Sequence, residues 1–406
     1  NGLTGVHDAG VSLDTLRVMQ ALADAGEMPM RITAMADGDG EALAWLCGEG
    51  LYQHPSQRLK MRTVKLYVDG ALGSRGAALL EDYSDDHGNA GLLMMTPEQL
   101  HAAVRKAAEC GVQVATHAIG DRGNRVVLDS YQAVLGDDAT GSDHRWRIEH
   151  AQILSPEDLP RLSALHAIAS MQPTHATSDM PWAEDRLGPR RINGAYAWRK
   201  LRDSGARLAL GSDFPVESVD PRFGLYSAST RTDGEGLPAG GWHPEDKLTA
   251  YEALRGFTLD AAYAGFAEDE VGSLAPGKRA DFVVLGQDPL AIPPASLRGL
   301  TVLSTWVDGF DGQELAWLEA TGDSACGDRL GAVLALHAEA RKGDVADHLP
   351  IDLGHPGRVL AHQPLAHAME RLDILLGDGL NRHKAHRRPG HRGAGCRGAS
   401  ALSRPP

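Results

Sequence analysis

The chain has 406 residues, a mass of 43.3 kDa, 42% apolar residues and a formal net charge of −14. This length is enough to bury a large core in one big domain or two modest ones. The negative charge disfavours nucleic acid and anionic membranes as general partners, and no apolar run approaches the roughly 18–20 residues that a membrane span needs.

The cysteines are far apart and form no CxxC pair; they are Cys47, Cys110, Cys326 and Cys396. They indicate neither a disulfide framework nor a zinc knuckle. Reduced thiols in a cytoplasmic protein are therefore expected.

Short apolar runs that end in polar residues alternate with amphipathic helical stretches from residue 1 to about residue 265. Seven runs are predicted strands: Leu3–His7, Met30–Ala34, Thr63–Val68, Gln113–His117, Trp146–His150, Ile168–Gln172 and Arg207–Gly211. The stretches between them include predicted helices at Thr96–Cys110 and Asp121–Leu135. The alternation predicts an α/β fold with a parallel sheet covered by helices. Seven such strands favour a (β/α)₈ barrel that lacks one unit over an open sheet.

The pattern changes beyond the last of these strands. A helix is predicted at Tyr251–Phe266, and the segment Val271–Leu285 reads as β-structure outside the barrel. Thr301–Val307 is another predicted strand, closed by the turn signal Asp308-Gly309. Three regions are therefore expected: a barrel at 1–266, a small β domain at 267–309, and a tail at 310–406 that is partly disordered and has some helical pattern at 329–341 and 360–376.

Lys65 interrupts the apolar strand Val64-Lys65-Leu66-Tyr67-Val68. A lysine that points into a barrel is unfavourable unless it is paired. An uncharged lysine can also take up CO₂ and become a carbamate that bridges two metal ions. The alternative is a lysine at a strand edge whose amine reaches solvent.

His117 and His150 each end an apolar strand, and Asp213 follows a third one. Barrel sites collect their ligands from successive strand ends, and neutral imidazole is the commonest protein ligand of zinc. A carboxylate at such a position can bind a metal and accept a proton from the attacking water. Taken singly, each histidine can be structural, and Gly211-Ser212-Asp213 can be a turn or a helix cap.

Lysine, histidine, histidine and aspartate in this order resemble the amidohydrolase superfamily, and more narrowly its amidohydrolase 3 branch of YtcJ-like and AepA-like proteins. The matching motifs are Val-Lys-Leu-Tyr-Val-Asp-Gly-Ala-Leu-Gly-Ser-Arg (64–75), Thr-His-Ala-Ile-Gly-Asp (116–121), Arg-Ile-Glu-His-Ala-Gln (147–152), Met-Gln-Pro-Thr-His (171–175), Gly-Ser-Asp-Phe-Pro (211–215) and Gly-Ser-Leu-Ala-Pro-Gly-Lys-Arg-Ala-Asp (272–281). The resemblance covers residues 1 to about 309 and nothing after them.

The resemblance implies a hydrolase with one or two divalent metal ions, usually zinc, that cleaves a C–N bond in a small amide-like substrate. By position, Lys65 would be the carboxylated bridging ligand, and His117 and His150 would bind one metal. Asp213 would be both a ligand and the general base.

Further residues have weaker implied roles. His175, in Gln-Pro-Thr-His, is expected to face the substrate, with a structural histidine as the alternative. Arg75 and Asp121 are candidates for contacts to the substrate or to the metal ligands, and Asp69 can orient its loop.

The sequence departs from the family pattern at its start. The family's first barrel strand ends in His-x-His, and this chain has no such pair before Lys65, because His7 and His54 stand alone. An N-terminally truncated chain is therefore expected, with an incomplete barrel and only the C-terminal half of a small β-sandwich domain.

The leading functional hypothesis is a metal-dependent amide hydrolase whose activity is impaired in this chain. The alternatives are a catalytically dead remnant with a binding or regulatory role, and a hydrolase of the same superfamily that acts on an ester, lactone or phosphoester. A homo-oligomer is possible, and residues 311–406 are expected to add nothing to catalysis.

Overall fold

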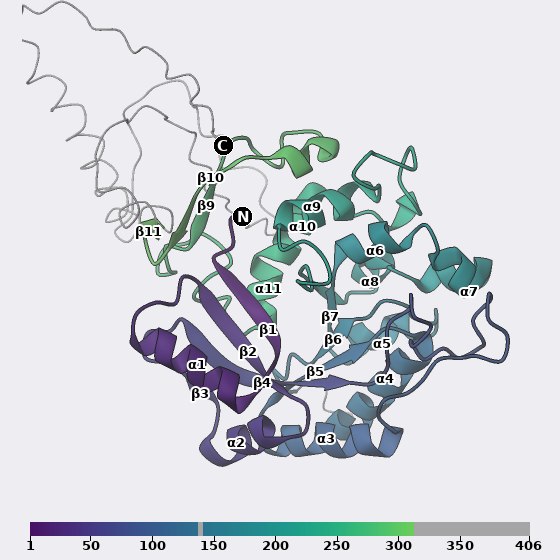
Figure 1. Ribbon diagram of the computed structural model, residues 1–406, viewed down its shortest axis with the longest axis horizontal. Helices are drawn as coiled ribbons and strands as arrows, with labels where there is room; N and C mark the ends of the chain where they lie inside the picture. The colour runs from purple at the N-terminus through teal and green to yellow at the C-terminus, as the bar shows by residue number, and fades with distance from the viewer. Residues whose placement is uncertain (137–140, 312–406) are drawn as a thin grey trace, which may run out of the picture. The chain divides into compact units, whose positions relative to one another are not determined.

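The computed structural model describes residues 1–136 and 141–311, and its main sheet curls into a partial barrel (Figure 1). Seven parallel strands follow one another in the order β1-β2-β4-β5-β6-β7-β8, and the short β3 pairs antiparallel with β4. The strands are β1 (Gly5–Val11), β2 (Arg31–Asp37), β3 (Tyr52–Gln53), β4 (Leu59–Tyr67), β5 (Gln113–Ala118), β6 (Arg147–His150), β7 (Ile168–Met171) and β8 (Arg207–Leu210). All seven predicted barrel strands are thus confirmed.

Helices connect the strands and cover the outside of the sheet. They are α1 (Leu13–Asp24), α2 (Glu41–Glu49), α3 (Pro97–Glu109), α4 (Asp121–Leu135), α5 (Leu159–Ala164), α6 (Pro173–Asp179), α7 (Ala183–Arg191), α8 (Trp198–Asp203), α9 (Pro221–Thr230), α10 (Ala250–Phe257) and α11 (Leu259–Ala264), with 3₁₀ turns at η2 (Ile192–Gly194), η3 (Pro244–Asp246) and η4 (Pro294–Gly299). The predicted cap of α3 is present: the Thr96 side chain accepts from the Gln99 amide, and the Gln99 side chain accepts from the Thr96 amide.

The structure corrects two predicted element boundaries, the end of the first strand and the extent of the last helix. The first strand runs on to Val11 instead of ending at His7, because its polar residues lie in the sheet and pair with β2. The helix predicted at Tyr251–Phe266 is two helices, α10 and α11. They are separated at Thr258, whose backbone is not helical (φ −123°, ψ −91°).

The register of the parallel strands brings the ends that carry chemistry together. Tyr67 of β4 is level with His117 of β5, and Ala118 is level with His150 of β6. The carboxyl ends of parallel strands lie on one side of a barrel, where the sites of such folds are found. The sheet therefore places the predicted ligands on one side.

The partial barrel is open between its two end strands. Within the described residues, β1 pairs only with β2, and β8 pairs only with β7. Arg147 of β6 spans the interior, where its Nη1 lies 2.7 Å from His7 Nδ1 of β1 and its Nη2 donates to Ser170 Oγ of β7 at 2.8 Å. Arg147 Nε also lies 2.7 Å from Glu149 Oε1. Arg147 thus links β6 to β1, with which β6 has no strand pairing within the described residues, and it adds a side-chain contact to the neighbouring β7.

A separate antiparallel sheet has the order β11-β10-β9, with β9 at Phe282–Leu285, β10 at Val302–Val307 and β11 at Phe310–Asp311. The predicted turn at Asp308-Gly309 joins β10 and β11. Arg31 of β2 connects the two sheets by donating to both carboxylate oxygens of Asp281 at 2.7 and 3.0 Å, and it also pairs with Asp308. Charge-assisted bidentate pairs of this kind fix geometry.

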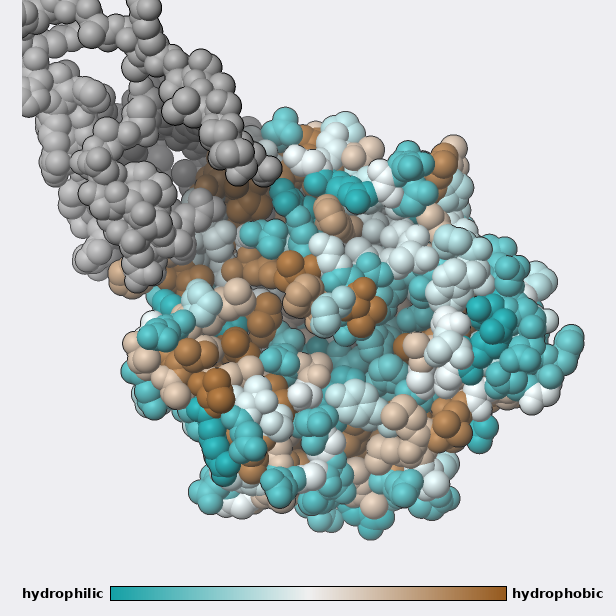
Figure 2. Space-filling view, viewed as in Figure 1, coloured by the Kyte–Doolittle hydropathy of each residue, from teal (hydrophilic) through white to brown (hydrophobic). Residues whose placement is uncertain are grey.

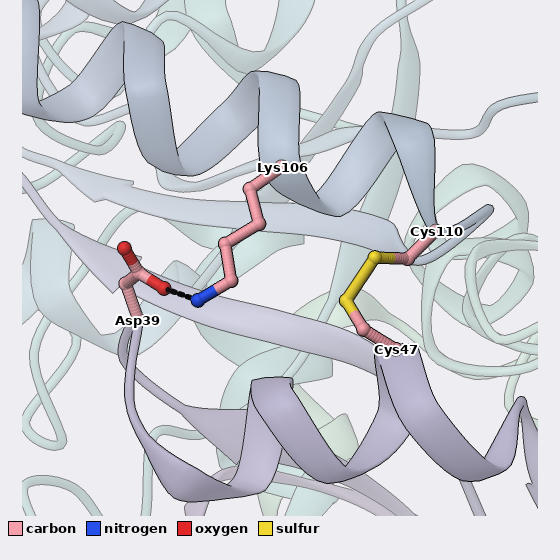
Figure 3. The surroundings of a disulfide bond; sticks show 4 residues. All are labelled: Asp39, Cys47, Lys106 and Cys110. Carbon is pink, nitrogen blue, oxygen red and sulfur yellow. Dashed lines mark hydrogen bonds and ion pairs between the residues drawn. A yellow bond between two sulfur atoms is a disulfide. The ribbon is translucent and has the colours of Figure 1, made fainter.

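Cys47 and Cys110 form a disulfide bond, which corrects the expectation of reduced thiols (Figure 3). Cys47 lies near the end of α2 and Cys110 caps α3, and their Cα atoms are 5.0 Å apart. One turn before Cys110, Lys106 in the last turn of α3 donates to Asp39, which precedes α2. The pair could not be recognised in the sequence because 63 positions separate the two cysteines.

The described residues contain no helix that is long and apolar enough to cross a membrane. On the face shown in Figure 2, hydrophobic residues are more frequent on the side of β1, α1 and the small sheet than over α7, which is mostly hydrophilic. The predicted tail at 310–406 begins two residues too early, because Phe310 and Asp311 form β11 of the small sheet. Its remainder, with the two helical patterns, lies outside the described residues.

Candidate metal centre

Lys65 is a buried interior residue of β4 with 3% of its surface exposed. Its Nζ lies 4.0 Å from the centre of the Tyr67 ring. Burial lowers the pKa of Lys65 to about 8, although the carboxylates of Glu149 and Asp213 act in the opposite direction. At pH 7 roughly a tenth of the amine is therefore uncharged, far more than for an ordinary lysine, and the uncharged amine is the form that reacts with CO₂.

Three histidines gather beside this lysine. The ring centres of His117 and His150 are 4.5 Å apart, and those of His150 and His175 are 5.7 Å apart with the rings nearly parallel. Burial lowers the pKa of His117 to about 3 and that of His175 to about 4, and it holds the pKa of His150 well below its usual value. All three are neutral imidazoles at pH 7, as metal ligands must be.

Hydrogen bonding leaves these imidazoles with lone pairs to offer. His150 Nδ1 lies 2.8 Å from Gln172 Oε1, an acceptor, so Nδ1 carries the proton and Nε2 is free to bind a cation. Gln172 is held in this orientation by its Nε2, which donates to Ser170 O at 3.4 Å. The Nε2 atoms of His117 and His175 are buried and lack a hydrogen-bond partner within the described residues.

Asp213 follows β8 and is partly exposed at the mouth of the barrel. Its Oδ2 lies 3.7 Å from His175 Nε2. Burial raises the pKa of Asp213, and the positive charge of Lys65 opposes this. Single donor atoms of His150, His175 and Asp213 all lie within 4.8 Å of one another. Two imidazoles and a carboxylate are a donor set that suits zinc and similar divalent cations.

The backbone at these strand ends is unusual. His150, Ala151 and Asp213 have φ values of 73°, 40° and 59°. Non-glycine residues seldom adopt positive φ, and such residues cluster at functional sites where the surrounding fold holds them. Here the turn lets a side chain at the strand end point across the mouth.

Asp69 joins the two loops beside His117. Its carboxylate accepts from the backbone amides of Ile119, Gly120 and Ala78 at 2.8–2.9 Å, and its Oδ1 lies 3.5 Å from His117 Nε2. The predicted loop-orienting position of Asp69 is therefore what the structure shows. Gly120 fits this junction because a Cβ there would lie 1.9 Å from Ala78 O.

Arg75 and Asp121 are not brought together with the histidines. Arg75 lies on the loop after β4, where it pairs with Asp85 at 2.9 Å. Asp85 also pairs with Arg186 of α7, so Arg75 belongs to a cluster that joins this loop to α7. Asp121 is buried at the start of α4, and its Oδ1 accepts from the Leu80 amide at 2.8 Å.

Two residues that shape the site received no role in the sequence interpretation. Gln172 orients His150, as described above. Glu149 is buried, with 6% of its surface exposed, and it pairs with Arg147. Its negative charge raises the pKa of Lys65 more than that of any other carboxylate and so opposes the effect of burial. The sequence could have indicated both residues, because Glu149 is a polar residue inside the buried strand β6 and Gln172 directly follows the buried strand β7.

Comparisons with known proteins agree with this geometry. The amidohydrolase family model matches residues 1–310. The putative amidohydrolase YtcJ of Bacillus subtilis is 34% identical over 313 residues, which are 76% of this chain and 58% of that protein. The N-substituted formamide deformylase of Arthrobacter pascens is 30% identical over 317 residues, 76% of this chain and 57% of that protein.

Among solved structures, an uncharacterized metal-dependent hydrolase from Pyrococcus horikoshii superimposes with a TM-score of 0.65 and 32% identity, covering 72% of this chain and 58% of that one. The chain thus spans less than two thirds of the length of each of these relatives. The match over residues 1–310 and the shared barrel lead to one conclusion: the chain belongs to the amidohydrolase family.

Proposed function

We propose that this chain forms the site of a metal-dependent hydrolase that cleaves a C–N bond in a small amide-like molecule. One observation carries the proposal. Buried, neutral imidazoles, two of which have an Nε2 without a hydrogen-bond partner among residues 1–136 and 141–311, lie with a lysine and a carboxylate at the ends of barrel strands. Zinc fits the nitrogen and oxygen donors best, and the number of ions is one or two.

The residue roles are proposed as follows. His117, His150 and Asp213 would hold a divalent cation, and Lys65 would bridge to a second ion after its uncharged amine forms an N–C bond with CO₂ and releases a proton. A divalent cation held there supplies Lewis acidity, which makes water a better nucleophile near neutral pH.

The protein side chains would do the remaining work. Gln172 keeps His150 in the tautomer whose Nε2 faces the mouth. Asp213 accepts the proton of the attacking water as general base. Its partly exposed position allows it to meet a substrate that enters from solvent.

The same proposal includes impaired turnover for the chain as given. The family places a His-x-His pair at the end of the first barrel strand, and the sequence of this chain contains no such pair before Lys65. Donors for a second ion are therefore fewer than the three protein ligands that a catalytic zinc usually has. A carbamate on Lys65 is stabilised when two metal ions share it, so it would be less stable if only one ion were bound.

The test starts from metal-free protein reloaded with zinc. Metal content is measured by mass spectrometry, and hydrolysis is measured on N-substituted formamides, the substrate class named by one relative, and on matched esters. Metal-dependent release of formate and amine, abolished by chelation, is expected. Stoichiometric zinc with hydrolysis of esters alone would contradict the C–N assignment. A protein that takes up no zinc and hydrolyses nothing would support the dead remnant.

A further inference from the structure

Gln152 follows directly after the unusual turn at the end of β6. The two residues before it, His150 and Ala151, have positive φ values of 73° and 40°. Non-glycine residues keep such angles only where the surrounding structure holds them. Gln152 closes the motif at 147–152 and received no role in the sequence interpretation. Its side chain is buried, with 4% of the residue exposed, so its contacts show what holds the turn.

The side chain of Gln152 belongs to a triangle of hydrogen bonds with Tyr196 and Asp179. Its Nε2 donates to Tyr196 Oη at 2.9 Å and to Asp179 Oδ2 at 3.2 Å. Tyr196 Oη donates to the same Asp179 Oδ2 at 2.6 Å. Hydrogen bonds to an ionised acceptor are stronger than those between neutral groups. Asp179 is therefore the common acceptor on which the other two side chains converge.

The backbone beside this triangle is fixed as well. The Tyr196 amide donates to Gln152 O at 2.7 Å. Tyr196 itself has a positive φ of 50°, and its carbonyl accepts from Nη1 of the buried Arg231 at 2.9 Å. Burial raises the pKa of Tyr196 well above its usual value, so its phenol is a neutral donor. Both the backbone and the side chain of Gln152 are thus held from the same side.

Asp179 is the last residue of α6, one helical turn after His175. Residues four apart lie on the same face of a helix. Burial raises the pKa of Asp179 to about 6 and the charge of Glu217 acts in the same direction, whereas the hydrogen bonds from Tyr196 and Gln152 lower it. A partly buried carboxylate is unfavourable unless donors compensate for the lost water. These two donors therefore stabilise the ionised form that holds them.

We infer that Asp179 is a positioning residue for His150. Its carboxylate fixes Gln152, and Gln152 holds the left-handed turn that aims the His150 ring across the mouth. Gln172 fixes the same ring at Nδ1, so separate contacts hold the backbone and the ring of His150. The inference rests on the proposed function, in which His150 binds a cation. In this role Asp179 touches neither the cation nor the substrate.

The experiment compares Asp179→Ala with Asp179→Asn and, as a matched control, Asp185→Ala. Asparagine keeps an oxygen that can accept from both donors, and Asp185 is an exposed carboxylate on the next helix, α7. Tyr196→Phe is a milder variant for the case that Asp179→Ala does not fold. It removes one donor and keeps the ring packed against Trp242.

Three measurements are made on each variant. Nitrogen-15 NMR of histidine-labelled, metal-free protein reports the tautomer of His150, and His150→Gln assigns its signals. Calorimetry with Zn²⁺ gives the affinity of the site, and urea unfolding gives the stability. A residue that only stabilises the fold would change the third measurement and leave the first two unchanged in the folded protein.

In Asp179→Ala we expect His150 to lose its single tautomer, with the proton on Nδ1. The zinc affinity should fall about 10–100-fold, the range for residues that orient a ligand. Asp179→Asn and Asp185→Ala should stay close to wild type in both measurements, because the first keeps the acceptor and the second lies outside the triangle. Tyr196→Phe should lie between wild type and Asp179→Ala.

Two outcomes overturn the inference and leave the proposed function standing. One is an Asp179→Ala protein that is less stable but has unchanged His150 signals and zinc affinity, which is a purely structural role. The other is an equal loss in Asp179→Ala and Asp179→Asn, because the shared acceptor would then not be the cause. Failure of the wild type to bind zinc would instead reject the proposed function, and the His150 signals alone would then confirm or reject the positioning.

Discussion

Three residues of the site have backbone angles that side chains seldom tolerate: His150, Ala151 and Asp213 all have positive φ. Such turns decide which way the side chains at the strand ends point. The sequence could therefore place a residue at the end of a strand, but it could not tell which other side chain that residue contacts. The sequence could place Lys65 and His117 near the carboxyl ends of two neighbouring barrel strands, and the structure puts them there on β4 and β5. Their roles toward a metal stay predictions. The contact between His150 and Gln172 depends on how two strand ends turn, and sequence spacing carries no information on that.

Replacing Asp213 with asparagine tests the general base. The amide keeps an oxygen that can bind a cation but cannot accept the proton. We expect Asp213→Asn to retain much of its metal and to lose about 10²–10⁴-fold in turnover. Metal content and kcat are measured on the same zinc-loaded sample, and a kcat within a factor of a few of wild type would remove Asp213 from this role.

Gln172 is expected to act on the metal through His150. Gln172→Leu removes the acceptor for His150 Nδ1, so the ring loses its preferred tautomer and orientation. The affinity for zinc should fall about 10–100-fold. Gln172→Glu keeps an oxygen acceptor and is the matched control, with an affinity close to wild type. Equal affinities in the leucine and glutamate variants would contradict the prediction.

At the scale of elements, the alternation of strands and helices was predictable along the whole barrel, because buried parallel strands leave short apolar runs in the sequence. Contacts between distant segments were not. Arg75 was a candidate for contacts to the substrate or to the metal ligands, which stays a prediction, but nothing in the sequence indicated its pairing with Asp85, which also pairs with Arg186 of α7. The cytoplasmic assignment also stays a prediction, and the disulfide between α2 and α3 weighs against it, because such bonds are rare in reducing compartments.

Gly120 lies where the loop after β5 packs closely against the backbone at Ala78 in the loop after β4. A methyl group there would lie 1.9 Å from Ala78 O, so Gly120→Ala must displace backbone that Asp69 holds in place. We expect the free energy of unfolding to fall by about 1–3 kcal/mol. Gly48→Ala is the control, since nothing lies within 4 Å of its Cβ and it stands in a helix. That variant should be neutral or gain about 0.5–1 kcal/mol. Urea unfolding measures both, and similar values would refute the steric argument.

The disulfide is expected to contribute to stability through the unfolded chain. Closing a loop of this length restricts the unfolded state by about 4 kcal/mol in the chain-entropy account, and measured values are often about 2–4 kcal/mol. Replacing Cys47 and Cys110 together with serine should lower the free energy of unfolding in that range. Dithiothreitol should destabilise wild type and leave the double variant unchanged. Peptide mapping that finds free thiols at both positions would contradict the bond.

At the scale of the whole molecule, the interior of the partial barrel is polar as well as apolar. Arg147 connects β1, β6 and β7, and several histidines are buried without charge. The overall barrel could be predicted from the order of its strands. The interior network could not, because its members come from strands that are distant in the sequence.

Buried neutral histidines predict how stability depends on pH. An unfolded histidine has a pKa near 6.5, whereas burial lowers the pKa of His175 to about 4 and that of His117 to about 3. At a pH between the folded and the unfolded pKa of a histidine, the unfolded state binds a proton that the folded state does not. The stability of metal-free protein should therefore fall as pH falls from 7 to 4, with a slope approaching about 1.4 kcal/mol per pH unit for each histidine.

Urea unfolding at several pH values measures this slope. The double variant His117→Gln with His175→Gln should show a flatter dependence than wild type. Equal slopes in the two proteins would show that these histidines are not the groups that take up the protons.

The bond between Cys47 and Cys110 has a consequence for the chain as a covalent object. The two cysteines are 63 positions apart, so the chain between them forms a closed ring. That ring contains β4 with Lys65 and the whole segment that runs on to α3. A single break in its backbone opens the ring but releases no fragment. The strand with the candidate bridging lysine thus remains attached to the molecule on both sides of such a break.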